Sequence, residues 1–195
     1  SGLNDEQMQQ IAREFNFSET TFVFPPEQGQ TKRVRIFTPT SEVPFAGHPN
    51  LGTAFTLYRN GYLGDAQPPL KVVFEEEAGL VPVTITNPDG GHSFFELQAP
   101  TPLSLGAEIN VEAVGQALSL SVSAIRSERH RPQLASVGLP FLLVELKDRE
   151  VLEKARPNLD AFPVLQAQGV AMMHLYVRSE DEFDLRTRMF ALLDG

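Results

Sequence analysis

The stretch Val43–Tyr58 reads Val-Pro-Phe-Ala-Gly-His-Pro-Asn-Leu-Gly-Thr-Ala-Phe-Thr-Leu-Tyr and contains no Asp, Glu, Lys or Arg. A surface helix carries a polar face opposite its apolar stripe, and this stretch has no such face. Pro49 suits the first position of a helix, because its missing N–H costs no hydrogen bond there. The sequence therefore predicts a buried central helix over residues 49–59, with strands of the same chain wrapped around it.

The start of this helix, at Gly47, His48 and Pro49, is a candidate anion site. Unpaired backbone N–H groups and the positive end of the helix dipole attract an anion such as a substrate carboxylate. Gly47 allows another group to approach the backbone closely. The alternative interpretation of His48 is a capping or packing residue.

Composition limits the classes of partner that the chain is expected to have. Its 195 residues carry 25 acidic and 16 basic side chains, a net charge of −9, which argues against nucleic acid or an anionic membrane as the main partner. The absence of cysteine excludes disulfides, thiolate metal sites and a cysteine nucleophile. No two of the four histidines have the i, i+4 spacing of a helical metal site, so no metal is expected. Without a long apolar run or a signal-like start, a cytoplasmic location is expected.

Hydrophobic periodicity and turn residues predict an α+β chain. Met8, Ile11, Ala12 and Phe15, for example, recur at helical spacing after a capping Asn4. The predicted helices cover residues 5–15, 49–59, 110–120 and 149–155, and the predicted strands cover residues 20–24, 32–38, 70–75, 80–86, 93–98, 134–137, 141–146, 170–177 and 187–192.

The polar stretch Arg126–Pro132 is typical of a linker and divides the chain into two parts. Residues 1–126 are predicted to form the first domain, around the central helix. Residues 127–195 open with strands but contain no apolar helix like 49–59. They are therefore predicted to be the first part of a second, incomplete domain.

Several charged or titratable residues have a plain structural interpretation. Glu19 is most simply a solvated acid in a turn, and Arg33 with Arg35 a solvated strand face. Glu75-Glu76-Glu77 is predicted to be the exposed end of a hairpin. His174, between apolar neighbours, is predicted to be a core residue.

Three blocks, taken together, resemble the PhzF-like phenazine-biosynthesis isomerase family. They are centred on Asn16-Phe17-Ser18-Glu19-Thr20-Thr21, Val34-Arg35-Ile36-Phe37-Thr38-Pro39 and Pro44-Phe45-Ala46-Gly47-His48-Pro49. Arg188-Met189-Phe190 is similar to the family's strand before its second active-site motif. The resemblance runs over nearly the whole chain.

The resemblance implies a diaminopimelate-epimerase-like fold, with two similar domains that each wrap a sheet around a central helix. It implies a cofactor-independent isomerase of a small carboxylated metabolite, similar to trans-2,3-dihydro-3-hydroxyanthranilate isomerase, and a homodimer. Glu19 matches the family's catalytic acid/base. His48 is expected to hold the substrate carboxylate and developing charge, and Ser18, Gly47 and Pro49 to contribute to substrate binding.

Two departures from the family pattern leave an alternative open. Without cysteine, the two-thiol chemistry of related racemases is excluded. The family's second motif, Glu-Asp-Pro-Ala-Thr-Gly-Ser, is expected just after Gly195, and its opening strand before Ser1. Either the enzyme is cut at both ends, or the chain is a natural remnant. In the second case we expect a non-catalytic protein that binds a small anion with half of the family's active site.

Overall fold

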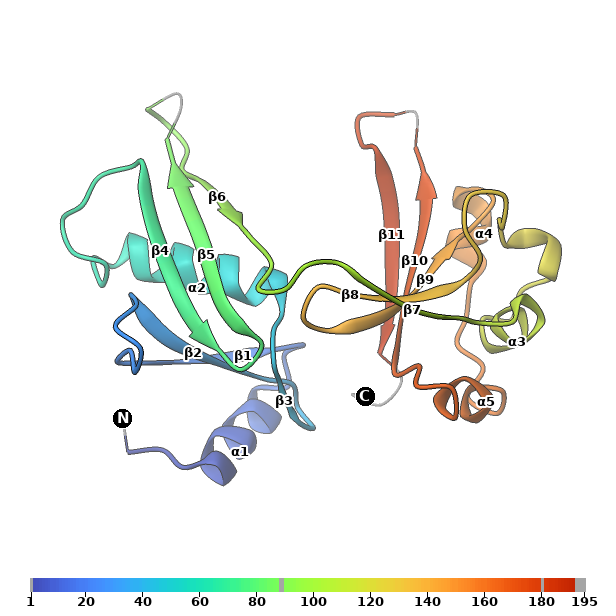
Figure 1. Ribbon diagram of the computed structural model, residues 1–195, viewed down its shortest axis with the longest axis horizontal. Helices are drawn as coiled ribbons and strands as arrows, with labels where there is room; N and C mark the ends of the chain where they lie inside the picture. The colour runs from blue at the N-terminus through green and yellow to red at the C-terminus, as the bar shows by residue number, and fades with distance from the viewer. Residues whose placement is uncertain (1, 88–89, 180, 192–195) are drawn as a thin grey trace. The chain divides into compact units, whose positions relative to one another are not determined.

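The computed structural model describes residues 2–87, 90–179 and 181–191, which form two compact units (Figure 1). The first unit contains the described residues up to Pro102, together with Val137–Leu139. The second contains residues 103–136 and the described residues from Pro140 onward. Each unit has one sheet and its own hydrophobic core.

The sheet of the first unit has the strand order β1-β2-β4-β5-β6, and β3 pairs with β2. Strands β2 and β4 are parallel and are joined through α2, whereas the other pairs are antiparallel. The elements are α1 (Asp5–Phe15), β1 (Thr20–Phe24), β2 (Lys32–Phe37), β3 (Glu42–Val43), α2 (Gly47–Arg59), β4 (Leu70–Glu76), β5 (Gly79–Thr86) and β6 (Phe94–Leu97).

Helix α2 is the predicted central helix, and it begins two residues earlier than expected, at Gly47. It contacts β1 and β6, which lie at the two ends of the strand order, so the sheet curves around it. Ala54 and Leu57 pack into a core with buried strand residues such as Phe74. Phe55, on another side of the helix, is 51% exposed.

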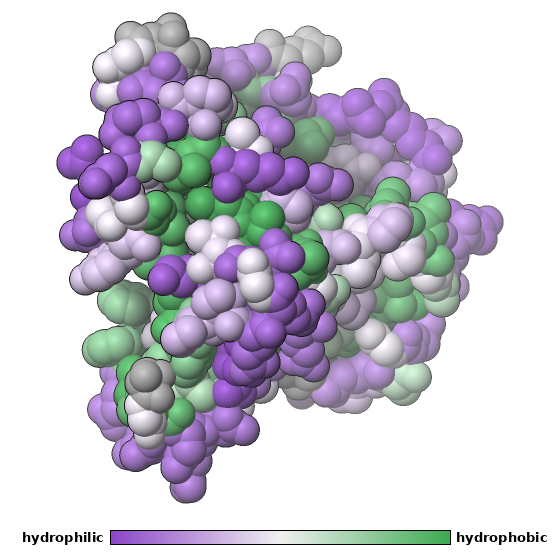
Figure 2. All heavy atoms as spheres, turned by 60° about the vertical axis from the view of Figure 1, so that its left-hand side comes forward, coloured by the Kyte–Doolittle hydropathy of each residue, from purple (hydrophilic) through white to green (hydrophobic). Residues whose placement is uncertain are grey.

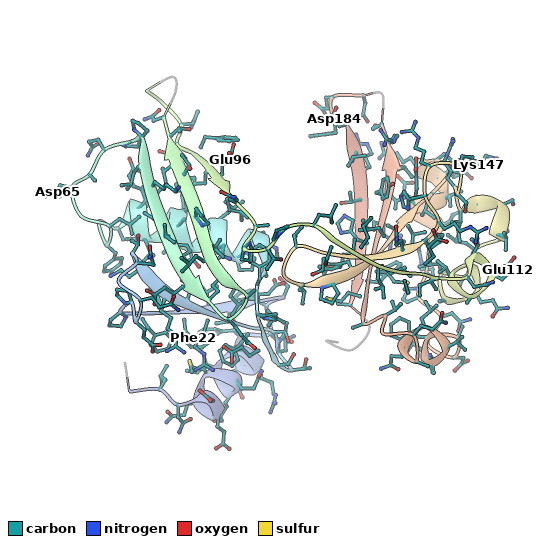
Figure 3. The ribbon with its side chains drawn as sticks, viewed as in Figure 1. Phe22, Asp65, Glu96, Glu112, Lys147 and Asp184 are labelled. Atoms are coloured by element: carbon teal, nitrogen blue, oxygen red, sulfur yellow. The ribbon has the colours of Figure 1, made fainter. Side chains whose placement is uncertain are left out.

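Helix α1 covers part of the other face of this sheet. Its capping box is formed by Asn4 and Gln7, as the sequence suggests. Met8 packs with Phe37 and with Phe22, which lies on β1 beside the helix (Figure 3). The strand face that carries Phe37 is therefore not simply solvated, because α1 buries part of it.

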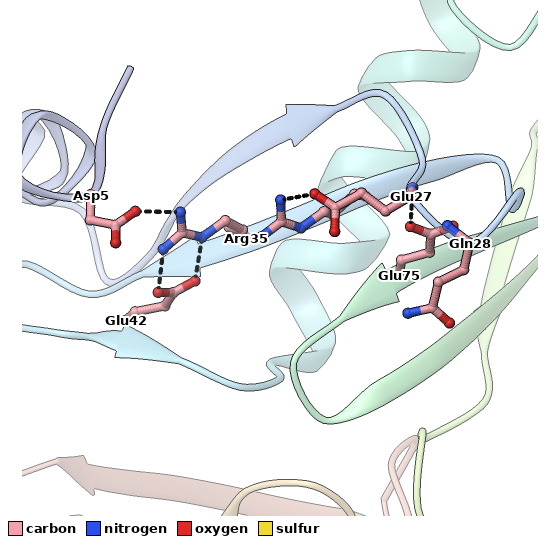
Figure 4. Close-up of polar contacts among 7 residues, drawn as sticks. Asp5, Glu27, Gln28, Arg35, Glu42 and Glu75 are labelled. Atoms are coloured by element: carbon pink, nitrogen blue, oxygen red, sulfur yellow. Dashed lines mark hydrogen bonds and ion pairs between the residues drawn. The ribbon is translucent and has the colours of Figure 1, made fainter. Parts of the chain in front are cut away.

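Arg35 corrects the expectation of a solvated strand face. Its guanidinium group donates two hydrogen bonds to Glu42, at 2.7 and 2.6 Å, and a third to Asp5 at 2.7 Å (Figure 4). Its side chain is only 16% exposed. The bidentate pair with Glu42 links β2 to β3, and the hydrogen bond to Asp5 links β2 to the start of α1. Arg33, more exposed, pairs with Glu27 at 2.6 Å.

The predicted exposed hairpin end is also corrected. Glu75 is 3% exposed, and its carboxylate accepts hydrogen bonds from the backbone N–H groups of Glu27, Gln28 and Gln30 at 2.6–3.1 Å (Figure 4). Burial opposes the charged form, but these donors hold the pKa of Glu75 below its usual value. Both side-chain oxygens of Glu76 are buried as well. Only Glu77 is exposed as predicted.

The second unit has the strand order β11-β10-β9-β8-β7, with β9 and β10 parallel. Helices α3, α4 and α5 contribute to its hydrophobic core. The elements are β7 (Ser104–Glu108), α3 (Val111–Ala117), the short 3-10 helix η1 (Val122–Ala124), β8 (Gln133–Ser136), β9 (Pro140–Glu145), α4 (Arg149–Lys154), α5 (Phe162–Gln166), β10 (Met172–Arg178) and β11 (Leu185–Ala191). The predicted last residue of the final strand, Leu192, lies outside the described residues.

The two units divide between Pro102 and Leu103, not at residue 126. Strand β7 pairs with β8, and Ile109, Val114 and Leu118 enter the core of the second unit. Residues 103–126 therefore fold with the second unit, and the stretch predicted as a linker lies within it.

On the face shown in Figure 2, polar side chains predominate and apolar side chains gather in patches between them. Within residues 2–87, 90–179 and 181–191, no helix has the length and apolar character needed to cross a bilayer.

Replacement of Phe74 by Ala tests the core around α2. Phe74 is fully buried, so we expect F74A to lower the free energy of unfolding by about 3–5 kcal/mol. The matched control is F94A, because Phe94 is 62% exposed and its loss should change stability by about 0.5 kcal/mol or less. Urea unfolding measures both. Equal losses in the two variants would contradict the described core.

Replacement of Glu75 by Gln tests the buried carboxylate. Because the folded-state pKa of Glu75 lies below its unfolded value, its stabilising effect is present above the unfolded pKa and is lost as the pH falls through the folded one. We expect E75Q to unfold at a lower temperature than the wild type at pH 7 and to lose less stability on acidification. Thermal unfolding across the acidic range measures this. If E75Q and the wild type show the same dependence of unfolding temperature on pH, stabilisation by the Glu75 carboxylate is contradicted.

Candidate functional site

Glu19 and His48 meet at the start of α2. Glu19 directly precedes β1, and His48 is the second residue of α2. His48 Nε2 lies 3.0 Å from Glu19 Oε2. The side chain of Glu19 is 13% exposed and that of His48 is 73% exposed, so the carboxylate is largely buried while the imidazole faces solvent. The fold thus brings together the two side chains that the sequence singles out as catalytic.

The start of α2 has no side-chain cap. Its N-cap residue, Ala46, is extended, with φ of −149°, and forms no side-chain hydrogen bond. The first turn contains no acidic residue to offset the positive end of the helix dipole. Glu19 supplies the neighbouring negative charge from outside the helix. Backbone N–H groups at such an uncapped start are suited to binding an anion.

One oxygen of the Glu19 carboxylate accepts no hydrogen bond. Although Oε2 is within ion-pair distance of His48, the contact does not have hydrogen-bond geometry, and this buried oxygen accepts no hydrogen bond. Buried polar atoms without a partner are uncommon in proteins, and each calls for an explanation such as a catalytic role or a bound group. A largely buried carboxylate with a free oxygen beside an imidazole can accept a proton and return it.

A groove of about 440 Å³ runs from this pair along α2. The side chains of Thr21 and Thr53 join its two walls, because Thr53 Oγ1 donates a hydrogen bond of 2.9 Å to Thr21 Oγ1. The lining residues are Glu19, Thr21 and Val23 from the β1 segment and His48, Pro49, Gly52, Thr53, Thr56 and Leu57 from α2.

The threonines and Gly52 are not among the predicted site residues, although a signal for them exists in the sequence. Thr21 follows Glu19 by two residues, so the two side chains share one face of an extended segment. Gly52 and Thr56 follow His48 at steps of four, which places them on one face of a helix. Once Glu19 and His48 are taken as the predicted catalytic residues, their periodicities therefore predict the groove.

The three predicted substrate-binding residues lie in different environments. Pro49 is buried and lines the groove. Ser18 is exposed and is not among the lining residues. A Cβ atom on Gly47 would meet only Leu97 Cδ2, at 3.9 Å, which is an ordinary contact. Packing within the described structure therefore does not require glycine at this position.

The chain is similar to several proteins named as isomerases. An uncharacterized isomerase of Mesorhizobium japonicum is 39% identical over 167 residues, which cover 84% of this chain and 54% of that protein. The trans-2,3-dihydro-3-hydroxyanthranilate isomerase of Pseudomonas aeruginosa is 40% identical over 141 residues, which cover 70% of this chain and 48% of that protein. The chain thus spans about half the length of these curated relatives.

Solved structures extend the comparison to the fold. The PhzF-family phenazine biosynthesis protein of Bacillus anthracis superimposes with a TM-score of 0.81 at 27% identity, over 97% of this chain and 63% of that one. A hydroxyproline epimerase from Agrobacterium vitis gives a TM-score of 0.65 at 17% identity, which shows likeness of fold alone. The match covers 95% of this chain and 60% of the epimerase. The predicted α+β, diaminopimelate-epimerase-like fold is confirmed.

The family model for phenazine biosynthesis-like proteins, PhzC-PhzF, matches residues 1–193. This range contains both compact units and the Glu19–His48 pair. Because the match covers nearly the whole chain, this chain belongs to the PhzC-PhzF family of phenazine biosynthesis-like proteins.

Proposed function

We propose that the protein is a cofactor-independent isomerase that moves a proton within a small carboxylated metabolite. The observation that carries this proposal is the approach of Glu19 to His48, at 3.0 Å, at the uncapped start of α2. Relatives named as isomerases support the reaction class.

Glu19 has the properties that a shuttling acid/base requires. A group that removes a proton from one carbon and returns it to another must be ionised first and protonated afterwards. The Oε2 atom, which accepts no hydrogen bond, is available to take that proton. Because Glu19 is only 13% exposed, bulk water has limited access to the carboxyl group while it holds the proton.

His48 and the α2 N-terminus are suited to the substrate's negative charge. The imidazole and the backbone N–H groups offer donors to a carboxylate and to charge that develops after proton removal. At Gly47 a Cβ atom would have little protein contact, so this position leaves room for a bound group beside the helix start. We assign the substrate carboxylate to this position.

The proposed substrate class is a carboxylated ring. The Pseudomonas aeruginosa relative is named for a dihydro-hydroxyanthranilate, and anthranilates carry a ring carboxylate. The alternative is a protein that binds a small anion at His48 and the helix start without turnover. This alternative requires no proton transfer, so the role of Glu19 separates the two.

Replacement of Glu19 by Gln tests the proposed acid/base. The assay is turnover of trans-2,3-dihydro-3-hydroxyanthranilate, with loss of the substrate and formation of its isomer followed by chromatography. We expect E19Q to lower turnover by about 10²–10⁴-fold, because the amide cannot take up the proton. The matched control is E14Q, since Glu14 is exposed on α1. Near-normal turnover by folded E19Q would refute the assigned role.

Replacement of His48 by Ala tests the anion site separately from catalysis. We expect H48A to bind anthranilate about tenfold more weakly, because a hydrogen-bond donor to the carboxylate is lost. Titration by NMR measures the affinity, and E19Q should still bind. If the wild type binds anthranilate but forms no isomerised product from trans-2,3-dihydro-3-hydroxyanthranilate, the anion-binding alternative replaces the isomerase.

A further inference from the structure

Three buried oxygen atoms without hydrogen-bond partners belong to Glu76 and Asn50. They are Oε1 and Oε2 of Glu76, at the end of β4, and Oδ1 of Asn50, in the first turn of α2. Asn50 has no exposed surface. Its side-chain amide faces the Glu76 carboxyl and lowers the pKa of that group, although the contact does not meet the geometry of a full hydrogen bond. The amide nitrogen also donates a 3.0 Å hydrogen bond to the carbonyl oxygen of Ala46.

The protonation state of Glu76 decides whether these atoms find partners. An ionised carboxylate only accepts hydrogen bonds, so it supplies no donor to Asn50 Oδ1. A neutral carboxyl group has one O–H donor and an acceptor oxygen. Its O–H can donate to Asn50 Oδ1, while the second N–H of the amide donates to the other carboxyl oxygen. The first amide N–H remains on Ala46, and every polar atom of the pair is then satisfied.

We propose that Glu76 is held as a neutral carboxylic acid paired with the Asn50 amide, and that this pair is a positioning device for the turn that carries His48. Asn50 is two residues beyond His48 and holds the carbonyl group of Ala46, the N-cap residue. The same β4–β5 turn holds the segment before α2, because Ala78 N–H donates to Pro44 O at 3.1 Å. Two links thus connect this turn to the start of the helix.

The electrostatic surroundings agree with this protonation state. Burial raises the pKa of Glu76 to about 8, and the Asn50 amide opposes this only in part. Glu75, whose side chain points to the other face of β4, has backbone N–H donors that Glu76 lacks.

Other charged groups on the neighbouring elements do not set this pKa. His48 on α2 is mostly exposed, Glu77 is exposed in the adjoining turn, and Glu96 is exposed on β6 (Figure 3). Glu19, before β1, faces His48. The pKa of Glu76 reflects burial and Asn50, with no contribution from these charges.

The inference predicts an alkaline loss of stability. The folded-state pKa of about 8 lies above the ordinary value of 4.5, so the stability gained from the neutral form is complete below 4.5 and is lost as the pH rises toward 8. Between these values the unfolding equilibrium constant should increase by up to tenfold per pH unit, which is about 1.36 kcal/mol. E76Q, which cannot ionise, should lack this component.

The test compares the wild type with E76Q and with E77Q as matched control, by urea unfolding at several pH values from 5 to 9. We expect the stability difference between E76Q and the wild type to grow with pH, and E77Q to follow the wild type. Infrared spectroscopy at pH 7 should show the carbonyl band of a protonated carboxyl group in the wild type and not in E76Q. If the stability difference between E76Q and the wild type does not change with pH, and the wild-type spectrum lacks the carbonyl band, the neutral state of Glu76 is overturned.

The positioning role of the Glu76–Asn50 pair is tested by a measurement at His48. We expect the NMR signals of the His48 ring to move in E76A, and to return to their wild-type positions in E76Q, whose amide can pair with Asn50. In the wild type these signals should also change as the pH passes about 8. Signals that are identical in E76A and the wild type would overturn the positioning role. None of these measurements uses turnover, so their failure is separate from failure of the proposed isomerase.

Discussion

The packing of α2 against its curved sheet is the constraint on which the first unit depends. The uncharged run that forms this helix cannot remain in water without cost, and the sheet removes Ala54 and Leu57 from solvent. The parallel pairing of β2 with β4 requires a crossover, and α2 is that crossover. Once the helix is placed this way, its N-terminus lies beside the start of β1. The meeting of Glu19 with His48 is therefore a result of core packing.

Elements with strong periodicity could be predicted from sequence, and weakly patterned ones could not. Helix α1 and strand β1 have the predicted bounds, because capping, apolar spacing and β-branched residues agree locally. Strand β7 is exposed along its whole length and contains Gly106, so only its pairing with β8 makes it a strand. Helix α5 has five residues, including Pro163. Missing β7 also displaced the predicted domain boundary, because β7 belongs to the second unit through its pairing with β8, which is not visible locally.

Charged residues were the least predictable part of the fold. Sequence shows that burying Arg35 or Glu75 is costly, but it does not show which distant groups compensate. The carboxylates of Glu42 and Asp5 offset the cost of burying Arg35, and the backbone N–H groups of a turn offset the cost of burying Glu75. The anion site at the start of α2 was predicted from local pattern, whereas the role of Glu19 was predicted only through family resemblance. The periodicities of the candidate site become informative only after two of its residues have been assigned.

Three glutamates of the first unit differ in their roles because different hydrogen-bond donors surround their carboxyl groups. Glu75 accepts three backbone N–H groups, and these favour its charge despite burial. Glu76 has no such donor, and burial favours its neutral form. Glu19 lies next to an imidazole and keeps one oxygen unpartnered. A carboxyl group fixed in either state cannot shuttle a proton, so under the proposed function only Glu19 is suited to that work. The other two glutamates hold the framework around it, one as an anion and one as an acid.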